Sequence, residues 1–146
     1  MKIYVKKLNE KAKLPSAQTE YAAASDLYAC LDGPLTVYPG ERAKIPTGIA
    51  IEYEDKNVAA VICSRSGLSA KHGISLTNGI GLIDPDYRGE LLVSVVNLSD
   101  RPYTFSDGDR IAQLLLLPII RGEFEEADEL GRTERGEGGF GSTGKA

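Results

Sequence analysis

Short apolar segments, separated by turns that contain glycine or proline, recur along the whole chain. From Ile49 to Glu54, large apolar residues alternate with small or charged ones, which is typical of a half-buried β-strand. Segments 58–63, 91–98 and 111–120 are almost continuously apolar. Such segments are typical of strands buried on both faces, either inside a sandwich or against another subunit. The pattern therefore predicts a protein built mainly from strands.

Turn signals and the lack of helical periodicity support this prediction. The segments "TVYPGERAKIP" and "FSDGDR" are predicted to be turns between strands, and only "GLSAKHG" favours a short helical turn. We therefore predict an all-β fold, a jelly-roll-like β-sandwich, for residues 1–122. After Pro118 the chain becomes acidic and then rich in glycine. Residues 123–146 are therefore predicted to form a flexible arm.

Composition narrows the class of function. The 146 residues carry a net charge of −4 and a pI of about 5.1, without a cluster of lysine and arginine, which argues against binding nucleic acid through its backbone. Cys30 and Cys63 lack metal-site spacing and are expected to be reduced, with a long-range disulfide as the alternative. The N-terminal segment becomes charged too early for a signal peptide, and no segment is long enough to span a membrane. A cytoplasmic protein that binds neither nucleic acid nor membranes is expected.

The segment "RGEGGFGSTG" (135–144) combines glycines with groups that can bind a nucleotide. Backbone amides, Arg135, Ser142 and Thr143 can contact phosphates, and Phe140 offers a face on which a base can stack. The following residues lack the hydroxyl that completes a P-loop, so we do not predict one. A plain flexible tail is the alternative.

Two further segments place candidate groups beside predicted strands. "SRSGLSAKHG" presents an arginine, a hydroxyl and a glycine (Arg65, Ser66 and Gly67) that together can bind an anion. In "NGIGLIDPDYRGE", two glycines around a short apolar run predict a hairpin with open backbone edges. Asp84 and Asp86 follow in the same segment, and carboxylates can accept a proton from water or bind a cation through water. Taken alone, each segment also fits a surface turn.

Three polar residues lie within or beside apolar strands. Gln113 can donate a hydrogen bond to a phosphate oxygen. Arg110 is predicted to pair structurally with an acid such as Asp86. Asp26 lies in the apolar segment "ASDLYACLD", where an unpaired carboxylate is costly. It needs a partner, which is either a protein donor or a hydrated metal.

Five motifs in order resemble those of the trimeric deoxyuridine triphosphatases, the dUTPase family. They are "ASDLYA", "RSGLSAKHGI", "NGIGLIDPDYRGE", "GDRIAQ" and "RGEGGFGSTG", and they span residues 24–144. The resemblance implies a jelly-roll subunit of the dUTPase-like β-clip type and a homotrimer with active sites shared between subunits. It implies hydrolysis of dUTP to dUMP and pyrophosphate, which controls the dUTP level and supplies dUMP. It also implies that the C-terminal arm crosses onto another subunit and closes over the nucleotide.

The resemblance further implies a role for individual residues. Asp84 would be the general base that activates water for attack on the α-phosphorus, and Tyr87 would pack beneath the deoxyribose. Asp26 would contact Mg²⁺ through water, with the metal held chiefly by the triphosphate. The other implied substrate-binding residues would read uracil (Asn78, Gly81, Leu82, Ile83), hold the phosphates (Arg65, Ser66, Gly67, Gln113) or belong to the arm (Arg135, Phe140, Gly141, Ser142, Thr143).

Two other functions fit parts of this pattern. The dCTP deaminases share the fold and much of the motif order, but they place a catalytic glutamate where this chain has Ser94. The other alternative is a non-catalytic jelly-roll protein that binds nucleotide as a sensor or only assembles. The presence of Asp84, Tyr87 and the glycine-rich segment argues against it, since assembly alone needs none of them. The sequence therefore favours dUTP hydrolysis over both alternatives. One departure from the family is that alanines precede Asp26 where a glycine is frequent.

Overall fold

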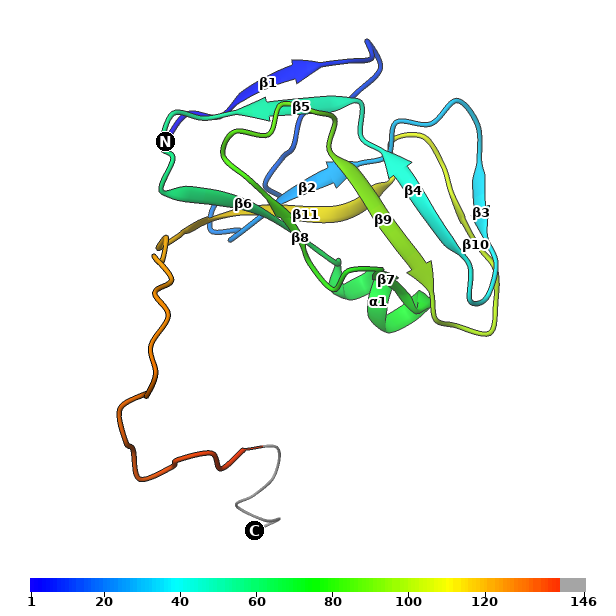
Figure 1. The fold of residues 1–146 in the computed structure, drawn as a ribbon. Helices are drawn as coiled ribbons and strands as arrows, with labels where there is room; N and C mark the ends of the chain where they lie inside the picture. The colour runs from blue at the N-terminus through cyan, green and yellow to red at the C-terminus, as the bar shows by residue number, and fades with distance from the viewer. Residues whose placement is uncertain (140–146) are drawn as a thin grey trace.

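The computed structural model describes residues 1–139, which form eleven strands and one short helix. Figure 1 shows these elements in chain order. The elements are β1 (Tyr4–Lys7), β2 (Ser25–Tyr28), β3 (Leu35–Val37), β4 (Arg42–Pro46), β5 (Ile49–Glu52), β6 (Val58–Cys63), α1 (Ser66–His72), β7 (Ile74–Leu76), β8 (Gly81–Ile83), β9 (Leu92–Asn97), β10 (Tyr103–Phe105) and β11 (Arg110–Pro118).

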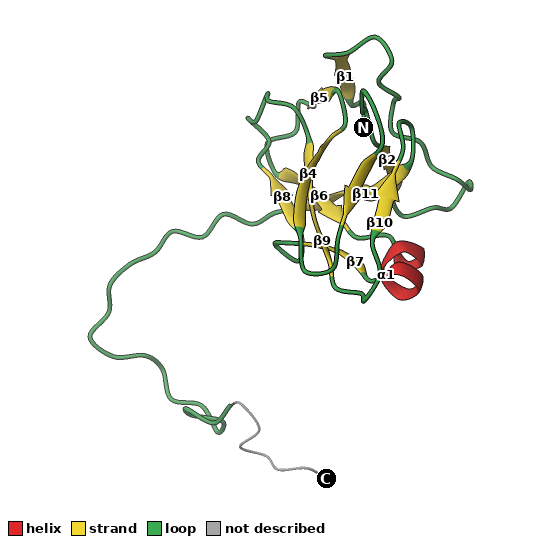
Figure 2. Ribbon diagram, turned by 90° about the vertical axis from the view of Figure 1, so that its right-hand side faces the viewer, coloured by secondary structure: helices red, strands yellow, loops and turns green. Residues whose placement is uncertain are grey.

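All strand pairs are antiparallel and lie in four small sheets. The largest sheet has the order β2-β11-β6-β8, and a three-stranded sheet has the order β4-β9-β7. Two-stranded sheets pair β1 with β5 and β3 with β10. Figure 2 shows the strands gathered into one body, with α1 at one edge. A long segment leaves the body on the side away from α1. The prediction of an all-β fold is confirmed.

The core lies between the sheets and contains side chains from both larger ones. Leu27 and Ile62 come from the four-stranded sheet, whereas Ile45, Val93 and Val95 come from the three-stranded sheet, and all five are at most 2% exposed. Aliphatic side chains of this size each contribute roughly 1.5–3 kcal/mol when fully buried. The sheets are therefore held face to face mainly by burial of branched aliphatic side chains.

The predicted burial patterns hold for some strands and fail for others. β6 is buried along its centre, as its continuous apolar sequence predicts. In a single chain the residues of β9 alternate, with Val93, Val95 and Asn97 buried and Leu92 47% exposed, so burial of its second face against another subunit stays a prediction. β5 was expected to be half-buried, but Ala50 is buried as well as its apolar neighbours. Periodicity alone cannot decide these cases because small residues fit either face.

The predicted helical turn is α1, which starts directly after Arg65 and ends at Gly73. Gly73 has a φ of +66°, a left-handed conformation that glycine adopts without steric cost. A Cβ at this position would lie 2.8 Å from the backbone nitrogen of Ser99. Glycine is therefore required here both for the backbone conformation and for the close approach of the chain after β9.

The segment after β11 differs from the rest of the described chain. Residues 119–139 contain no helix or strand, and nearly all of them are exposed. Figure 1 shows this segment leading away from the body. The division between a body of residues 1–122 and an arm of residues 123–146 stays a prediction. The predicted arm residues Phe140, Gly141, Ser142 and Thr143 lie outside the described residues.

Two expectations based on composition can be compared with this fold. Cys30 and Cys63 are both free thiols, so the alternative of a long-range disulfide is excluded. Cys30 is buried, and burial raises the pKa of its thiol. Among residues 1–139, no helix is long and apolar enough to cross a membrane.

Candidate active site

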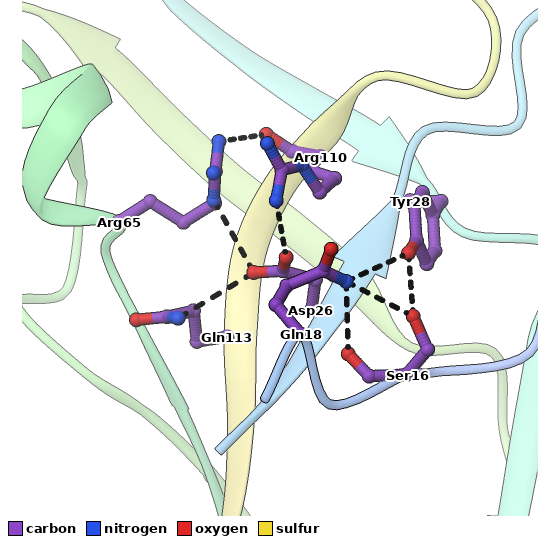
Figure 3. Close-up of polar contacts among 7 residues, drawn as sticks. All are labelled: Ser16, Gln18, Asp26, Tyr28, Arg65, Arg110 and Gln113. Atoms are coloured by element: carbon purple, nitrogen blue, oxygen red, sulfur yellow. Dashed lines mark hydrogen bonds and ion pairs between the residues drawn. The ribbon is translucent and has the colours of Figure 1, made fainter. Parts of the chain in front are cut away.

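Strand pairing brings together three segments that are distant in the sequence. In the pair of β2 and β11, Asp26 lies opposite Gln113. In the pair of β11 and β6, Gln113 lies opposite Cys63, and Arg65 follows two residues later. The central strand β11 therefore places Gln113 between Asp26 on one side and the start of α1 on the other. Figure 3 shows the side chains of this group converging.

The Asp26 cluster, which consists of Asp26, Arg65, Arg110 and Gln113, is a compact charged network. Arg65 Nε lies 3.3 Å from Asp26 Oδ1, and Arg110 Nη1 lies 3.1 Å from Oδ2. Gln113 Nε2 donates a long hydrogen bond of 3.4 Å to Oδ1. Asp26 is only 2% exposed, so these donors offset the cost of burying its charge.

This network answers one open question and corrects one prediction. The partner that Asp26 requires is a set of protein donors. Arg110 does pair structurally with an acid, but the acid is Asp26 and not Asp86. The pairing of β11 with β2 shifts its register between Arg110 and Ala112, and this shift places the Arg110 side chain on the same face of the sheet as Asp26. Arg65 Nη1 also donates to the Arg110 carbonyl at 3.0 Å. The two guanidinium groups are therefore fixed relative to one another as well as to the carboxylate.

A second polar group, formed by Ser16, Gln18 and Tyr28, lies beside Asp26 and was not predicted from the sequence. Asp26 N donates to the Ser16 carbonyl at 2.8 Å. Ser16 Oγ and Tyr28 Oη lie 2.6 Å apart, and Gln18 Nε2 donates to Ser16 Oγ at 3.2 Å (Figure 3). Tyr28 and Asp26 are in the same strand, so this contact fixes β2 against the chain that precedes it. A serine and a glutamine in a loop carry no sequence signal for this contact.

Ser66 and Gly67 form the first turn of α1, directly after Arg65, and both are exposed. No atom would lie within 4 Å of a Cβ on Gly67, so the backbone there is open to an incoming group. Together with Gln113, these residues provide a guanidinium, a hydroxyl, an amide and free backbone N–H groups on one edge of the body. Such a set of donors can bind phosphate oxygens.

A small pocket lies where the chain passes from one sheet to the other. It has a volume of about 190 Å³ and is lined by Ile62, Leu76, Asn78, Gly81, Leu82, Ile83, Leu92, Val93 and Ser94. The hairpin predicted within residues 78–90 was wrong, because β8 is the one strand of that segment and it pairs with β6. The preceding strand β7 pairs with β9 and not with β8. Both strands are instead sheet edges with free backbone groups. The four residues predicted to read uracil do line one pocket.

The Asp84 turn (residues 84–87) follows β8 directly. Asp84 is exposed, and Tyr87 N donates to its carbonyl at 3.1 Å. The Tyr87 hydroxyl donates to the Glu90 carbonyl at 3.1 Å, and the side chain is 44% exposed. A Cβ on Gly89 would lie 2.3 Å from Tyr87 Oη, so the ring takes this position only because residue 89 is glycine.

The negative charge of Asp84 affects the pKa of Tyr53, a buried residue. Tyr53 is 2% exposed, and burial raises the pKa of its phenol. The negative charge of Asp84 acts in the same direction, whereas the positive charge of Arg88 acts against it. Tyr53 therefore stays neutral and contributes no charge to this part of the molecule.

Within one chain, Asp84 does not lie near the Asp26 cluster. Ile83, which precedes Asp84, pairs with Ala60 in β6, whereas Arg65 follows the other end of that strand. The five residue steps from Ala60 to Arg65 span roughly 16 Å at about 3.3 Å per residue in an extended chain. Arg135 lies in the segment that leads away from the body, and its Nε donates to the Gly138 carbonyl at 2.8 Å (Figure 1). The predicted site residues therefore form separate groups on a single chain.

The side chains of residues 1–139 do not form a site for a metal ion held by the protein alone. Within residues 1–139, no group of three or more His, Cys, Asp or Glu side chains is placed to hold a metal ion. Both carboxylate oxygens of Asp26 are already contacted by guanidinium groups. Asp26 as it stands is therefore not a direct metal ligand.

Comparisons with known proteins identify the family. The family model described as dUTPase matches residues 10–144. The chain is 53% identical over 141 residues to the deoxyuridine 5'-triphosphate nucleotidohydrolase of Desulfitobacterium hafniense, covering 97% of this chain and 93% of that protein. It is 51% identical over 145 residues to the protein of the same name from Coxiella burnetii, covering 99% and 95%.

Solved structures show the same fold. The dUTPase of Staphylococcus bacteriophage 80alpha with dUpNHpp superposes with a TM-score of 0.88 at 27% identity, covering 99% of both chains. A mutant dUTPase from phage phi11 of S. aureus, described with a structural Mg(II) ion, has a TM-score of 0.79 at 23% identity, covering 90% of this chain and 100% of that one. The resemblance read from the five motifs is confirmed, and so is the predicted activity. The chain belongs to the dUTPase family and is a dUTP diphosphatase.

Proposed function

We propose that the chain hydrolyses dUTP in a homotrimer whose active sites combine the Asp26 cluster of one subunit with the Asp84 turn of another. The observation that carries this proposal is the separation of Asp84 from Arg65 at opposite ends of β6. A single water molecule must contact both the general base and a phosphorus atom that the phosphate-binding residues hold. Two copies related by rotation can bring these groups together, as cyclic symmetry allows.

In this site Asp84 acts as the general base. Its carboxylate is exposed, and within residues 1–139 no hydrogen bond or ion pair engages it. It accepts a proton from a water molecule whose oxygen attacks the α-phosphorus. The bond from that phosphorus to the bridging oxygen breaks, and dUMP and pyrophosphate leave. Catalysis then depends on holding the water, the carboxylate and the phosphorus in line.

The base and the sugar are selected at the other end of the site. The pocket of about 190 Å³ holds uracil against Asn78 and the backbone of Gly81, Leu82 and Ile83. Buried backbone donors and acceptors reject a base with the wrong hydrogen-bond pattern by roughly 10⁴-fold, whereas excluding a methyl group by shape is worth about 1–3 kcal/mol. Tyr87, fixed over Gly89, packs beneath the deoxyribose and excludes a 2′-hydroxyl.

The phosphates are held by Arg65, Ser66, Gly67 and Gln113. Asp26 keeps Arg65 in position through the contact of 3.3 Å. Mg²⁺ enters as part of the substrate, bound to the triphosphate, where it neutralises charge on the phosphate oxygens. A contact between Asp26 and a water of that ion stays a prediction. The Asp26 Oδ2 atom, which only Arg110 contacts among residues 1–139, has a lone pair that could accept such a hydrogen bond.

The remaining parts of the proposal concern the arm and the cell. Arg135, Phe140, Gly141, Ser142 and Thr143 belong to an arm that closes over the nucleotide in another subunit, with Phe140 stacked on uracil. Support comes from the exposed, extended segment that precedes them. The enzyme acts in the cytoplasm, where it lowers the dUTP level and supplies dUMP.

Subunit mixing tests this proposal. Arg65→Gln and Asp84→Asn variants are each expected to be inactive, but a mixture refolded together regains activity. Random assembly of equal amounts leaves about one interface in four with both side chains intact. Activity is followed as dUMP and pyrophosphate formed from dUTP with Mg²⁺, and sedimentation confirms the trimer. A mixture as inactive as its components contradicts the shared site, and the refolded wild-type protein serves as the control.

A further inference from the structure

The Asp84 turn is tied to the loop between β5 and β6 through one backbone carbonyl. Pro85, the buried residue after the exposed Asp84, accepts a hydrogen bond from Lys56 Nζ at 3.3 Å and another from Arg88 Nη1 at 3.0 Å. Hydrogen bonds with a charged donor are about twice as strong as neutral ones. The backbone position of Asp84 therefore depends on two cationic side chains that have no role in the proposed chemistry.

Lys56 is itself held by the residues that follow β11. Arg121 Nη1 donates to Asn57 Oδ1 at 3.2 Å, and Arg121 Nη2 donates to the Lys56 carbonyl. Ile119 N donates to the Asn57 carbonyl at 2.8 Å. Lys56 Nζ makes a further contact of 3.4 Å with the Tyr53 carbonyl. Lys56 therefore lies between the Asp84 turn and the start of the segment that leaves the body.

These groups border one open pocket of about 440 Å³. Its lining consists of Lys56, Asp84, Pro85, Asp86, Ile119 and Arg121. The other donor to Pro85, Arg88, is fixed differently, by an ion pair of 2.9 Å with Glu52. Only Lys56 therefore connects the Pro85 carbonyl with the segment after β11 among the contacts described for residues 1–139.

We propose that Lys56 is a positioning residue for Asp84 and that Arg121 fixes Lys56. The first residues after β11 and the Asp84 turn of the same chain then move together. This inference rests on the proposed role of Asp84 as general base. Lys56 and Arg121 act through the Pro85 carbonyl, and neither is among the residues proposed to bind the nucleotide. A displaced base slows the chemical step, because rate depends steeply on alignment. It leaves the affinity for the nucleotide largely unchanged.

The test uses substitutions that remove the donor and keep the aliphatic stem. Lys56→Met is expected to lower kcat by about three- to tenfold, the range that loss of one hydrogen bond produces. KM for dUTP is expected to change by less than about twofold, because only the chemical step is affected. Arg121→Met is expected to act in the same direction. The double variant should be no slower than the slower single variant, since both act through one contact.

Conservative and distant substitutions provide the controls. Lys56→Arg retains a charged donor and is expected to recover most of the lost kcat, which a change in packing alone would not explain. Lys44→Met removes an exposed lysine of β4 that makes no side-chain hydrogen bond within residues 1–139, and it is expected to leave kcat unchanged. Thermal unfolding of each variant checks that the fold is intact at the assay temperature.

The outcomes separate this inference from the proposed function. If Asp84→Asn is inactive while Lys56→Met and Arg121→Met keep the wild-type kcat, the positioning role is overturned and the role of Asp84 stands. If Asp84→Asn keeps full activity, the proposed general base is wrong, whatever the lysine variants show. In the Asp84→Asn background, Lys56→Met is expected to leave the residual rate unchanged. A further loss as large as that in the wild type would mean that Lys56 acts independently of Asp84.

Discussion

Asp26 and Asp84 are the two aspartates of the proposed site, and their surroundings are opposite. Asp26 is 2% exposed and has both oxygens engaged by Arg65 and Arg110. Asp84 is exposed, and its carboxylate has no hydrogen bond or ion pair within residues 1–139. The turn around Asp84 is nevertheless well fixed, since the Pro85 carbonyl accepts two hydrogen bonds. The carboxylate of Asp26 is therefore held by ion pairs, whereas Asp84 is held through the backbone of its turn and its carboxylate has no partner within residues 1–139.

This difference indicates how the two residues contribute to one reaction. Asp26 is buried and both of its oxygens are contacted by guanidinium groups, which leaves little room for a water molecule to be activated there. Such a group instead fixes the positions of the arginines that bind it. A carboxylate without partners can receive a proton from water, provided that its position is fixed by other means. The comparison therefore supports the proposed roles, which are positioning for Asp26 and proton transfer for Asp84.

The largest effect is expected from Asp84→Asn. The amide keeps the size of the side chain but does not accept the proton, so kcat should fall by about 10²–10⁴-fold, the contribution of general base catalysis. Binding of the nucleotide should persist, because no contact to the substrate other than the attacking water is removed. Steady-state turnover of dUTP and calorimetry with dUpNHpp measure the two quantities. A variant that turns over normally would remove the distinction between the two aspartates.

Asp26→Asn is expected to act on stability and affinity before it acts on chemistry. The substitution removes the charge between Arg65 and Arg110, and hydrogen bonds to charged groups contribute about 1.5–3 kcal/mol each. We expect the free energy of unfolding to fall by about 2 kcal/mol, together with a higher KM for dUTP. Denaturant unfolding and steady-state kinetics check both results. If kcat fell as far as in Asp84→Asn while stability was unchanged, Asp26 would be a catalytic group and not a positioning one.

Much of the fold follows from local patterns in the sequence. Continuous apolar runs identify β6 and β11, and "GLSAKHG" identifies α1. The sequence fails where pairing decides the outcome. The two glycines within residues 78–90 predict a hairpin, but β8 pairs with β6 and the preceding β7 pairs with β9, in a different sheet. That choice depends on contacts with β6 and β9, which no local pattern records.

The site shows the same limit. The chemical types of Arg65, Gln113 and Asp84 indicate phosphate binding and proton transfer, and the order of the motifs adds the family. The structural pairing of Arg110 with an acid was predicted correctly, but the acid is Asp26 and not the suggested Asp86. The shift of register between β2 and β11, which no local pattern records, brings Arg110 to Asp26. Lys56 has no sequence signal at all. Its importance comes from a backbone carbonyl that lies 29 residues further along the chain.

The smallest effect concerns the ring that lies above Gly89. Gly89→Ala places a methyl group where Tyr87 Oη and Cζ now lie, at 2.3 and 2.5 Å from the added carbon, so the ring must move. Its hydrogen bond to the Glu90 carbonyl is lost, and the space beneath the sugar opens. We expect the ratio of kcat/KM for dUTP to that for UTP to fall by about tenfold, equivalent to about 1.4 kcal/mol.

Tyr87→Phe is the matched control, because it removes the same hydrogen bond but keeps the ring over a glycine. If both variants lose discrimination equally, the hydroxyl contact and not the position of the ring excludes the ribose. If neither does, Tyr87 has no part in selecting the sugar, and the Asp84 turn contributes only its carboxylate.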